Sequence, residues 1–194
     1  MNFLAHIYLS GDDELIKIGN FMADGIRGKD YLLLPLKVQK GVLLHRNIDS
    51  FTDVHPVFRK STQRLHANYH HYAGVIVDVF YDHFLAKNWT LYSTIPLENY
   101  VDDFYQSLSA NREILTSKTL QLMPYMIAAN WLVSYRTIAG ISRILLQMDQ
   151  RTKNKSGMGR SVSELRLHYE LFEQEFFTFF DDVMAFADLK IKEL

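Results

Sequence analysis

The chain has 194 residues, a formal net charge of −1 and no cysteine. Disulfides, thiolate metal sites and cysteine nucleophiles are therefore excluded, and general nucleic-acid binding, which needs a basic excess, is not expected. With 48% hydrophobic residues, residues 1–194 are expected to form one compact domain. The N-terminus lacks signal-peptide features and no apolar run approaches ~20 residues, so we expect a soluble cytoplasmic protein with no membrane partner.

Apolar residues recur at helical spacing from end to end and strand signals are nearly absent, so the sequence predicts an all-α fold. Pro35, Pro56 and Pro96 each stand where a helix can begin, because the missing N–H of proline costs little there. The expected helices cover residues 2–9, 12–24, 35–50, 56–69, 72–88, 97–114, 120–134, 137–149 and 163–191.

Two of these helices carry the first candidates for chemistry. His6 lies in NFLAHIYL, and a lone histidine on an apolar helix is more often a hydrogen-bonded core residue than a ligand. Asp24 and Arg27 end the apolar segment GNFMADGIRG. Asp24 can bind a cation and Arg27 can hold phosphate oxygens with its planar guanidinium, although a weak salt bridge between the two would give the same pattern.

The expected helix 35–50 brings a second pair. In GVLLHRNIDSFTD, His45 and Asp49 are four residues apart, with Arg46 beside them. On one helical face this pair can offer an imidazole nitrogen and a carboxylate oxygen to Zn²⁺, Mn²⁺ or Fe²⁺. A simple hydrogen bond between the two side chains remains an alternative.

The helix 72–88 contains VIVDVFYDHFL, in which Asp78, Asp82 and His83 interrupt a run that otherwise looks buried. Carboxylates are costly to bury unless they are paired, hydrogen-bonded or bound to a metal. Asp78 and Asp82 share one helical face and need such a partner, which is either a neighbouring backbone, an arginine or a cation.

Two later segments are assigned no chemistry. DQRTKNKSGMGRS, residues 149–161, combines charge, serine and glycine, and is predicted to be a mobile basic surface loop. The last helix spaces aromatic residues at helical intervals, which is typical of core packing.

Together, histidine and aspartate side chains on separate helices, with arginines nearby, favour metal-assisted attack of water on a phosphate ester. Neither GxSxG, a Walker A loop nor GxGxxG occurs in the chain. The corresponding hydrolase, P-loop and Rossmann interpretations therefore lack support.

Five short stretches in register along most of the chain carry a family resemblance. They are Met1-Asn2-Phe3-Leu4-Ala5-His6; Gly19-Asn20 with Ala23-Asp24 and Arg27-Gly28; His45-Arg46 with Ile48-Asp49 and Thr52-Asp53; Asp78 with Asp82-His83-Phe84-Leu85; and Trp131-Leu132 with Tyr135-Arg136. Together they resemble the bacterial acyl carrier protein phosphodiesterases.

The resemblance implies a phosphoric diester hydrolase that releases 4′-phosphopantetheine from the serine of holo acyl carrier protein. It also implies a divalent cation, typically Mn²⁺, and an HD-like helical domain, since the family is a divergent relative of the HD-type phosphohydrolases. By position it places five side chains near the metal, with Asp82 as a ligand or an orienting partner: Asp24, His45, Asp49, Asp78 and Asp82. His6 and His83 are then candidates for a general acid or for supporting the ligands, and Arg27 and Arg46 for holding the phosphate.

Because acyl carrier proteins are acidic, the basic residues Lys37, Lys40, Arg59 and Lys60 and the 149–161 loop are expected to form a salt-sensitive docking surface. Two other functions remain open. The same metal site can act on a small nucleotide or pantetheine phosphate, or the chain can be a helical carrier-binding module without metal or catalysis. The oligomeric state is not predicted.

Overall fold

The computed structural model describes residues 1–194, and all of its regular elements are helices, which confirms the predicted all-α fold. The α-helices are α1 (Phe3–Tyr8), α2 (Glu14–Met22), α3 (Leu36–Val54), α4 (Pro56–Tyr69), α5 (Ala73–Lys87), α6 (Leu97–Ala110), α7 (Ser117–Ala128), α8 (Trp131–Ser134), α9 (Ile138–Arg151), α10 (Val162–Leu167) and α11 (Tyr169–Glu193). Short 3₁₀ turns join them: η1 (Ala23–Gly25), η2 (Asp30–Leu33), η3 (His70–Tyr72), η4 (Trp89–Leu91), η5 (Arg112–Ile114) and η6 (Met158–Arg160). None of the helices is long and apolar enough to cross a lipid bilayer.

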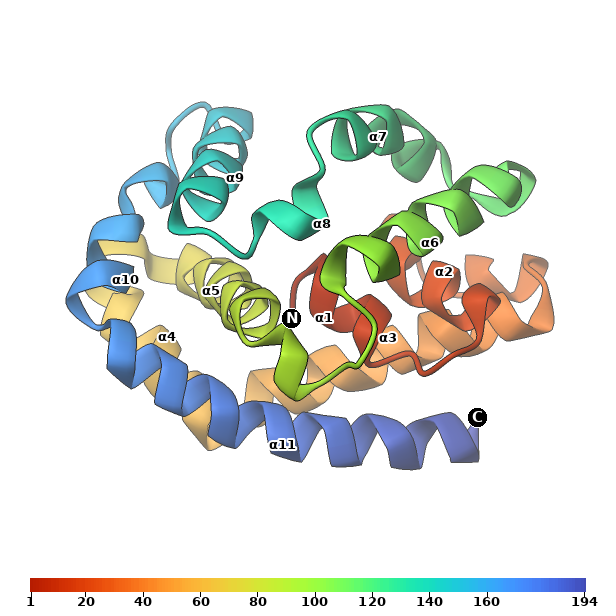
Figure 1. Ribbon diagram of the computed structural model, residues 1–194, viewed down its shortest axis with the longest axis horizontal. Coiled ribbons are helices and arrows are strands. Elements are labelled where there is room, and N and C mark those ends of the chain that lie inside the picture. Colours follow the sequence, from red (N-terminus) through yellow and green to blue (C-terminus); the bar gives the residue numbers. More distant parts are fainter.

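Helices α1 and α5 lie in the middle of the molecule, with α11 and α3 on one side of them and α7, α8 and α9 on the other (Figure 1). One cluster of buried apolar side chains connects these layers. The aromatic stripe of the last helix belongs to it, since Phe172, Phe176, Phe179 and Phe180 are fully buried. Core packing, as predicted, is therefore the role of that stripe.

Two predicted helices are each broken in two. The expected helix 120–134 divides into α7 and α8 at Asn130, whose φ of 44° is left-handed. Asparagine tolerates this conformation better than most residues, and apolar spacing gives no sign of it. The expected helix 163–191 is likewise divided at His168 into α10 and α11. The predictions of single helices were wrong at these two places.

Helices α2 and α3 pack with their backbones in contact. A Cβ atom at Gly19 would lie 2.2 Å from the carbonyl oxygen of Val38, and one at Gly41 would lie 2.2 Å from that of Ile16. Only glycine fits such an approach. The close crossing brings the residue after Gly19, Asn20, beside the part of α3 that follows Gly41.

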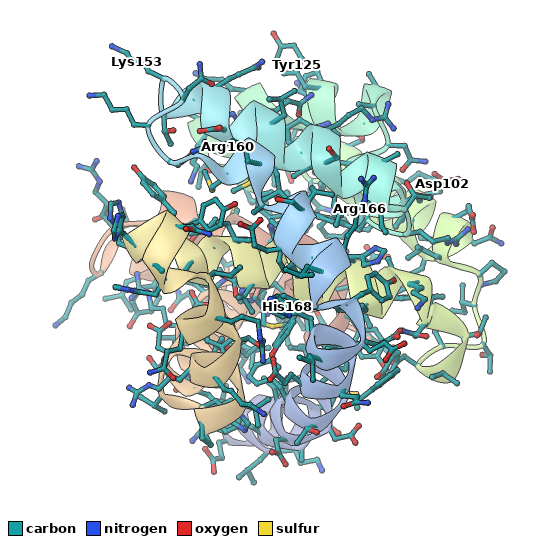
Figure 2. The ribbon with its side chains drawn as sticks, turned by 90° about the vertical axis from the view of Figure 1, so that its left-hand side faces the viewer. Asp102, Tyr125, Lys153, Arg160, Arg166 and His168 are labelled. Atoms are coloured by element: carbon teal, nitrogen blue, oxygen red, sulfur yellow. The ribbon has the colours of Figure 1, made fainter.

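The segment predicted to be a mobile loop folds around one aspartate. Helix α9 continues to Arg151, and the carboxylate of Asp149 then accepts hydrogen bonds from Ser156 Oγ (2.7 Å) and from the backbone N–H groups of Gly157 (2.9 Å) and Gly159 (3.3 Å). The basic side chains of Arg151, Lys153, Lys155 and Arg160 are exposed, and Lys153 extends away from the ribbon (Figure 2). Mobility of this loop stays a prediction.

Candidate metal centre

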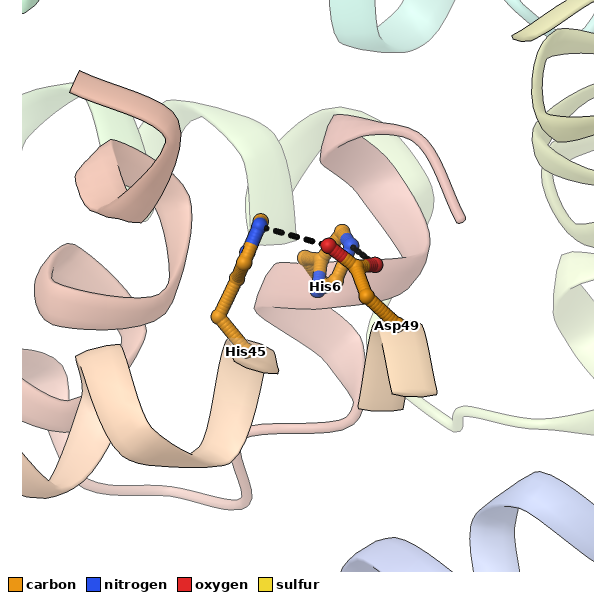
Figure 3. Close-up of side chains that lie close together, drawn as sticks. All are labelled: His6, His45 and Asp49. Atoms are coloured by element: carbon orange, nitrogen blue, oxygen red, sulfur yellow. Dashed lines mark ion pairs between the residues drawn. The ribbon is translucent and has the colours of Figure 1, made fainter. Parts of the chain in front are cut away.

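Three side chains from two helices meet in one group: His6 of α1, and His45 and Asp49 of α3 (Figure 3). Asp49 Oδ1 lies 3.2 Å from His6 Nε2, and Asp49 Oδ2 lies 3.0 Å from His45 Nε2. The two imidazole rings stack with their centroids 4.1 Å apart. One potential ligand atom from each residue lies within 4.8 Å of the others, so the group can hold a metal ion.

The helical geometry of α3 explains why His45 and Asp49 lie together, because residues four apart on a helix share a face. Asn20 of α2 fixes the orientation of the His45 ring. Its amide nitrogen donates to the His6 carbonyl and to Ser10 Oγ, both at 2.9 Å, so its amide oxygen faces His45 Nδ1 at 3.1 Å. Nδ1 must then carry the proton and donate it, which turns Nε2 toward Asp49. A metal-binding histidine is usually oriented by such a bond.

The protonation of the two imidazoles differs. Burial lowers the pKa of His45, but bonds to Asp24 and Asp49 outweigh it and raise the pKa to about 9. Burial and the neighbouring charge of His45 lower the pKa of His6 to about 4. Burial opposes ionisation of Asp49, yet both histidines hold its pKa well below the usual range. The group therefore has one carboxylate between a neutral and a charged imidazole.

The residues present fit a divalent cation. Both ring nitrogens of His6 are buried without a hydrogen-bond partner, a state that is rare for buried polar atoms. The contact between His6 Nε2 and Asp49 lacks hydrogen-bond geometry, so the ring of His6 keeps bonding capacity that a cation can use. Imidazole nitrogen together with carboxylate oxygen suits Mn²⁺, Fe²⁺ or Zn²⁺.

Asp24, in η1, approaches the same imidazole from the rim. Its Oδ1 lies 3.3 Å from His45 Nε2, and its side chain is 61% exposed. The bond to His45 lowers the pKa of Asp24. The structure thus brings together Asp24, His45 and Asp49, three of the five side chains predicted to lie near the metal. His6 joins them, although it had been predicted as an acid or a supporting residue.

The two aspartates of α5 have partners at the N-terminus of the chain and in α1. Asp82 is fully buried and accepts hydrogen bonds from the backbone N–H groups of Leu4 (2.8 Å) and Ala5 (3.2 Å). Burial raises its pKa to about 7. Asp78 Oδ1 lies 3.0 Å from the Met1 ammonium group. Asp82 therefore holds the first turn of the helix that carries His6, and Asp78 lines the pocket beside it.

His83 lies apart from this group. Its Nδ1 donates to the carbonyl oxygen of Tyr135, and its Nε2 accepts from the hydroxyl of Tyr169, both at 2.8 Å. Burial lowers its pKa, in agreement with a neutral ring. Both nitrogens are already used, and the structure does not bring His83 to the other candidates.

The two candidate arginines flank the segment that follows Asp24. Arg46 donates to the carbonyl oxygen of Ile26 (3.3 Å), and its guanidinium lies 5.1 Å from the ring centre of Tyr31. Arg27 is exposed in the same segment. Both cations are thus near the exposed side of Asp24, and neither bonds to the His/Asp group.

The group opens into a pocket of about 200 Å³. His6, Asp24, His45 and Asp78 form its polar end, and the remaining wall is mostly apolar and includes Phe3, Phe21, Val75, Trp131, Tyr135, Ile144, Gln147, Met148 and Arg151. Sequence reasoning assigned no role to Asn20, Ile144, Gln147 or Met148, and it assigned Arg151 only to the docking loop. The spacing of positions 144, 147, 148 and 151 does indicate one helical face, and this pattern in the sequence could have identified them as a group.

The fold and this site define an all-helical protein with a His/Asp centre at one end of a pocket. A family model described as acyl carrier protein phosphodiesterase matches residues 1–183. The acyl carrier protein phosphodiesterase of Escherichia coli is 31% identical over 191 residues, which cover 98% of this chain and 99% of that protein. That of Photorhabdus laumondii is 29% identical over 191 residues, covering 98% and 96%.

The chain therefore belongs to the acyl carrier protein phosphodiesterase family. Membership confirms the predicted enzyme class, a phosphoric diester hydrolase, and the predicted activity of an acyl carrier protein phosphodiesterase. No solved structure matches the chain.

Proposed function

We propose that the chain hydrolyses the phosphodiester between 4′-phosphopantetheine and the serine of holo acyl carrier protein, with a divalent cation held by His6, His45 and Asp49. The observation that carries the metal site is the meeting of these three side chains, with unpartnered nitrogens on His6, in a member of this family. Asp24 provides a further carboxylate from the rim. We propose Mn²⁺ as the cation, since it accepts mixed imidazole and carboxylate ligands.

A bound divalent cation supplies Lewis-acid polarisation of the phosphoryl group and a nucleophile at neutral pH. The protein orients the reaction around it. Asn20 fixes the ring of His45, Asp82 fixes the turn that carries His6, and Asp24 lines the pocket with an exposed carboxylate that can accept a hydrogen bond from water. Water adds to phosphorus, the bond from phosphorus to the serine oxygen breaks, and that oxygen leaves with a proton.

Arg27 and Arg46 are proposed to offset the charge of the phosphodiester from the segment beside Asp24. Guanidinium groups suit phosphate oxygens because their planar N–H groups match the oxygen geometry. For His83 we propose a positioning role through Tyr135 rather than the role of a general acid, since neither ring nitrogen is free.

The acidic carrier is proposed to dock around the mouth of the pocket, where electrostatic attraction speeds encounter. Of the predicted docking residues, Lys37 already pairs with Asp13 (2.7 Å) and Lys60 lies 3.4 Å from Glu175. Lys153 and Lys155 are exposed just beyond Arg151, which lines the pocket. Charge reversal at Lys153 and Lys155 should raise KM at low salt more than at high salt, and equal KM values at both would remove this loop from docking.

The function is tested by intact-mass analysis of holo acyl carrier protein incubated with the protein and Mn²⁺, with and without a chelator. Loss of the phosphopantetheine mass that the chelator prevents supports both the reaction and the metal. Calorimetric titration with Mn²⁺ gives a second readout, in which His45→Ala should abolish binding and the exposed control His66→Ala should not. An unchanged carrier with metal bound would favour a small phosphodiester as substrate, and an unchanged carrier with no metal bound would favour a binding module.

A further inference from the structure

A groove leads away from the His/Asp centre between α8 and α9. Ile144, Gln147, Met148 and Arg151 follow one another at i, i+3, i+4 and i+7, which places them on one face of α9, and all four line the pocket. Trp131 and the fully buried Tyr135 form the facing wall. The guanidinium of Arg151 lies 5.7 Å from the ring centre of Trp131, a cation–π contact that joins α9 to α8 at the outer end of the groove.

The residues that line the groove become more exposed to solvent with distance from the His/Asp centre. Tyr135 and Ile144 are buried, Trp131 and Met148 are half-buried, and Gln147 and Arg151 are exposed. Trp131, Gln147 and Arg151 also border a second, more open hollow with Tyr125, Ala128, Ala129 and Gln150. The two hollows therefore share an edge at Trp131, Gln147 and Arg151, and the amide side chains of Gln147 and Gln150 lie at the outer end of the groove.

Two backbone features fix the position of these walls. A Cβ atom at Gly140 would lie 1.8 Å from the carbonyl oxygen of Ser134, so α9 can approach the end of α8 only with glycine there. The carbonyl of Tyr135, one residue further, is held by His83 of α5. The groove is thus a preformed feature, which lowers the entropic cost of ordering a ligand in it.

We propose that this groove binds the pantetheine arm of the substrate, with Trp131 and Gln147 as its specificity-determining residues. This inference rests on the proposed function, because it takes the phosphodiester to lie at the His/Asp centre. From there the arm extends as a flexible chain that carries a geminal dimethyl group and two amides. The Trp131 ring packs against the dimethyl carbon atoms, and the Gln147 side chain exchanges hydrogen bonds with an amide.

The dimensions of the pocket select the arm rather than a segment of the carrier. A helix with its side chains is about 10–12 Å wide, which a pocket of about 200 Å³ cannot admit. A single extended chain fits, so the carrier protein stays outside and only its prosthetic group enters. Apolar walls with a few placed polar groups are the usual lining of a small-molecule site.

The kinetic test compares native protein with Trp131→Ala, Trp131→Phe, Gln147→Ala and the exposed control Gln174→Ala of α11, using holo acyl carrier protein and Mn²⁺. Trp131→Ala should raise KM by about tenfold with kcat within about twofold, and Gln147→Ala should raise KM by about threefold. Trp131→Phe should recover most of the loss and Gln174→Ala should match native. KM values within twofold of native for both Trp131→Ala and Gln147→Ala overturn the inference.

A binding test separates the groove from catalysis. The chain has two tryptophans, so Trp89→Phe leaves Trp131 as the only indole emitter. Titration of this variant with pantetheine, which has neither phosphate nor carrier, should change the Trp131 emission saturably, and added Gln147→Ala should weaken the response. If native protein hydrolyses the carrier but pantetheine leaves the emission unchanged, the inference is overturned. If pantetheine binds but the carrier is not hydrolysed, the proposed function fails and the groove assignment stands.

Discussion

Two buried polar clusters in the molecule serve different purposes. In one, Glu175 of α11 accepts two hydrogen bonds of 2.8 Å from Arg64 and another from Ser61, whose hydroxyl lies 2.8 Å from that of Tyr81. In the other, His6 has two buried nitrogens without a hydrogen-bond partner. Burial of polar groups is common to both, but only the second cluster has unused bonding capacity.

The difference shows how to tell a structural network from a site. A buried network in which every group is bonded cannot take a ligand without losing bonds, so it acts by fixing the fold. A buried group with free lone pairs is costly to the protein alone and gains from a ligand. The position of the site is thus marked by unpaired atoms such as His6 Nε2 rather than by polarity as such.

Removal of the Asp49 carboxylate should abolish most of the activity of the His/Asp centre. Asp49→Asn should lower kcat/KM by about a hundredfold or more, because even a residue that only supports a metal ligand costs up to about that much. Thermal unfolding of the metal-free protein should show that the fold is kept. The control is Asp182→Asn, which removes the negative charge 3.2 Å from His55 Nε2, outside the pocket, and should leave activity unchanged. Native activity of Asp49→Asn would exclude it from the site.

The corresponding substitution in the fully hydrogen-bonded Glu175 cluster should lower stability and leave activity unchanged. Glu175→Gln weakens the bonds to Arg64 and leaves charged groups buried without compensation, so unfolding in urea should show a loss of about 2 kcal/mol. Mn²⁺ affinity and kcat of the folded fraction should match native protein. A fall in Mn²⁺ affinity would contradict the division between the two clusters.

The His/Asp centre should also respond to pH. In the metal-free protein the pKa of His45 is about 9, above the value of about 6.5 for an unfolded chain. Protonated His45 thus contributes stability that is fully present below about pH 6.5 and is lost as the pH rises through about 9. Because a cation competes with this proton, Mn²⁺ affinity should rise by up to about tenfold per pH unit between pH 7 and 9.

Calorimetry at pH 7, 8 and 9, with thermal unfolding of the metal-free protein at the same values, checks both trends. Asp24→Asn removes one partner of His45 and should shift both trends to lower pH. An Mn²⁺ affinity that is independent of pH over this range would show that His45 is not a ligand.

The smallest expected effect concerns His83. Tyr169→Phe removes the hydroxyl that donates to His83 Nε2 and should cost about 1 kcal/mol of stability. Because His83 is proposed to act only through Tyr135, kcat and its pH profile should not change. A kcat that falls severalfold, or a shifted pH profile, would restore His83 as a candidate acid.

The helices themselves could be predicted because apolar spacing and proline positions are local signals. The pairing of His45 with Asp49 is local in the same sense, being one helical turn. The breaks at Asn130 and His168 were missed, since both depend on single backbone conformations that leave the apolar spacing intact.

What the sequence left open was which helices meet. Asp78 and Asp82 resemble His45 and Asp49 in spacing. Asp78 nevertheless pairs with the Met1 ammonium group, and both oxygens of Asp82 accept hydrogen bonds from backbone N–H groups of α1. His6 taken alone resembled a core residue, and only the family resemblance made it a candidate acid or supporting residue; in the structure it lies against Asp49. Contacts between separate helices follow from packing, such as the crossing at Gly19 and Gly41, and spacing within one helix contains no information about it.

The side chains of the His/Asp centre and the walls of the groove come from separate stretches of the chain. His6, Asn20, Asp24, His45 and Asp49 all lie within the first 49 residues, whereas the α8–α9 walls lie between residues 131 and 151. The residues proposed for the reaction and those proposed for recognition of the arm thus occupy separate segments of the sequence. Exchange of residues 131–151 between relatives is therefore a direct route to altered substrate selectivity with an unaltered catalytic centre.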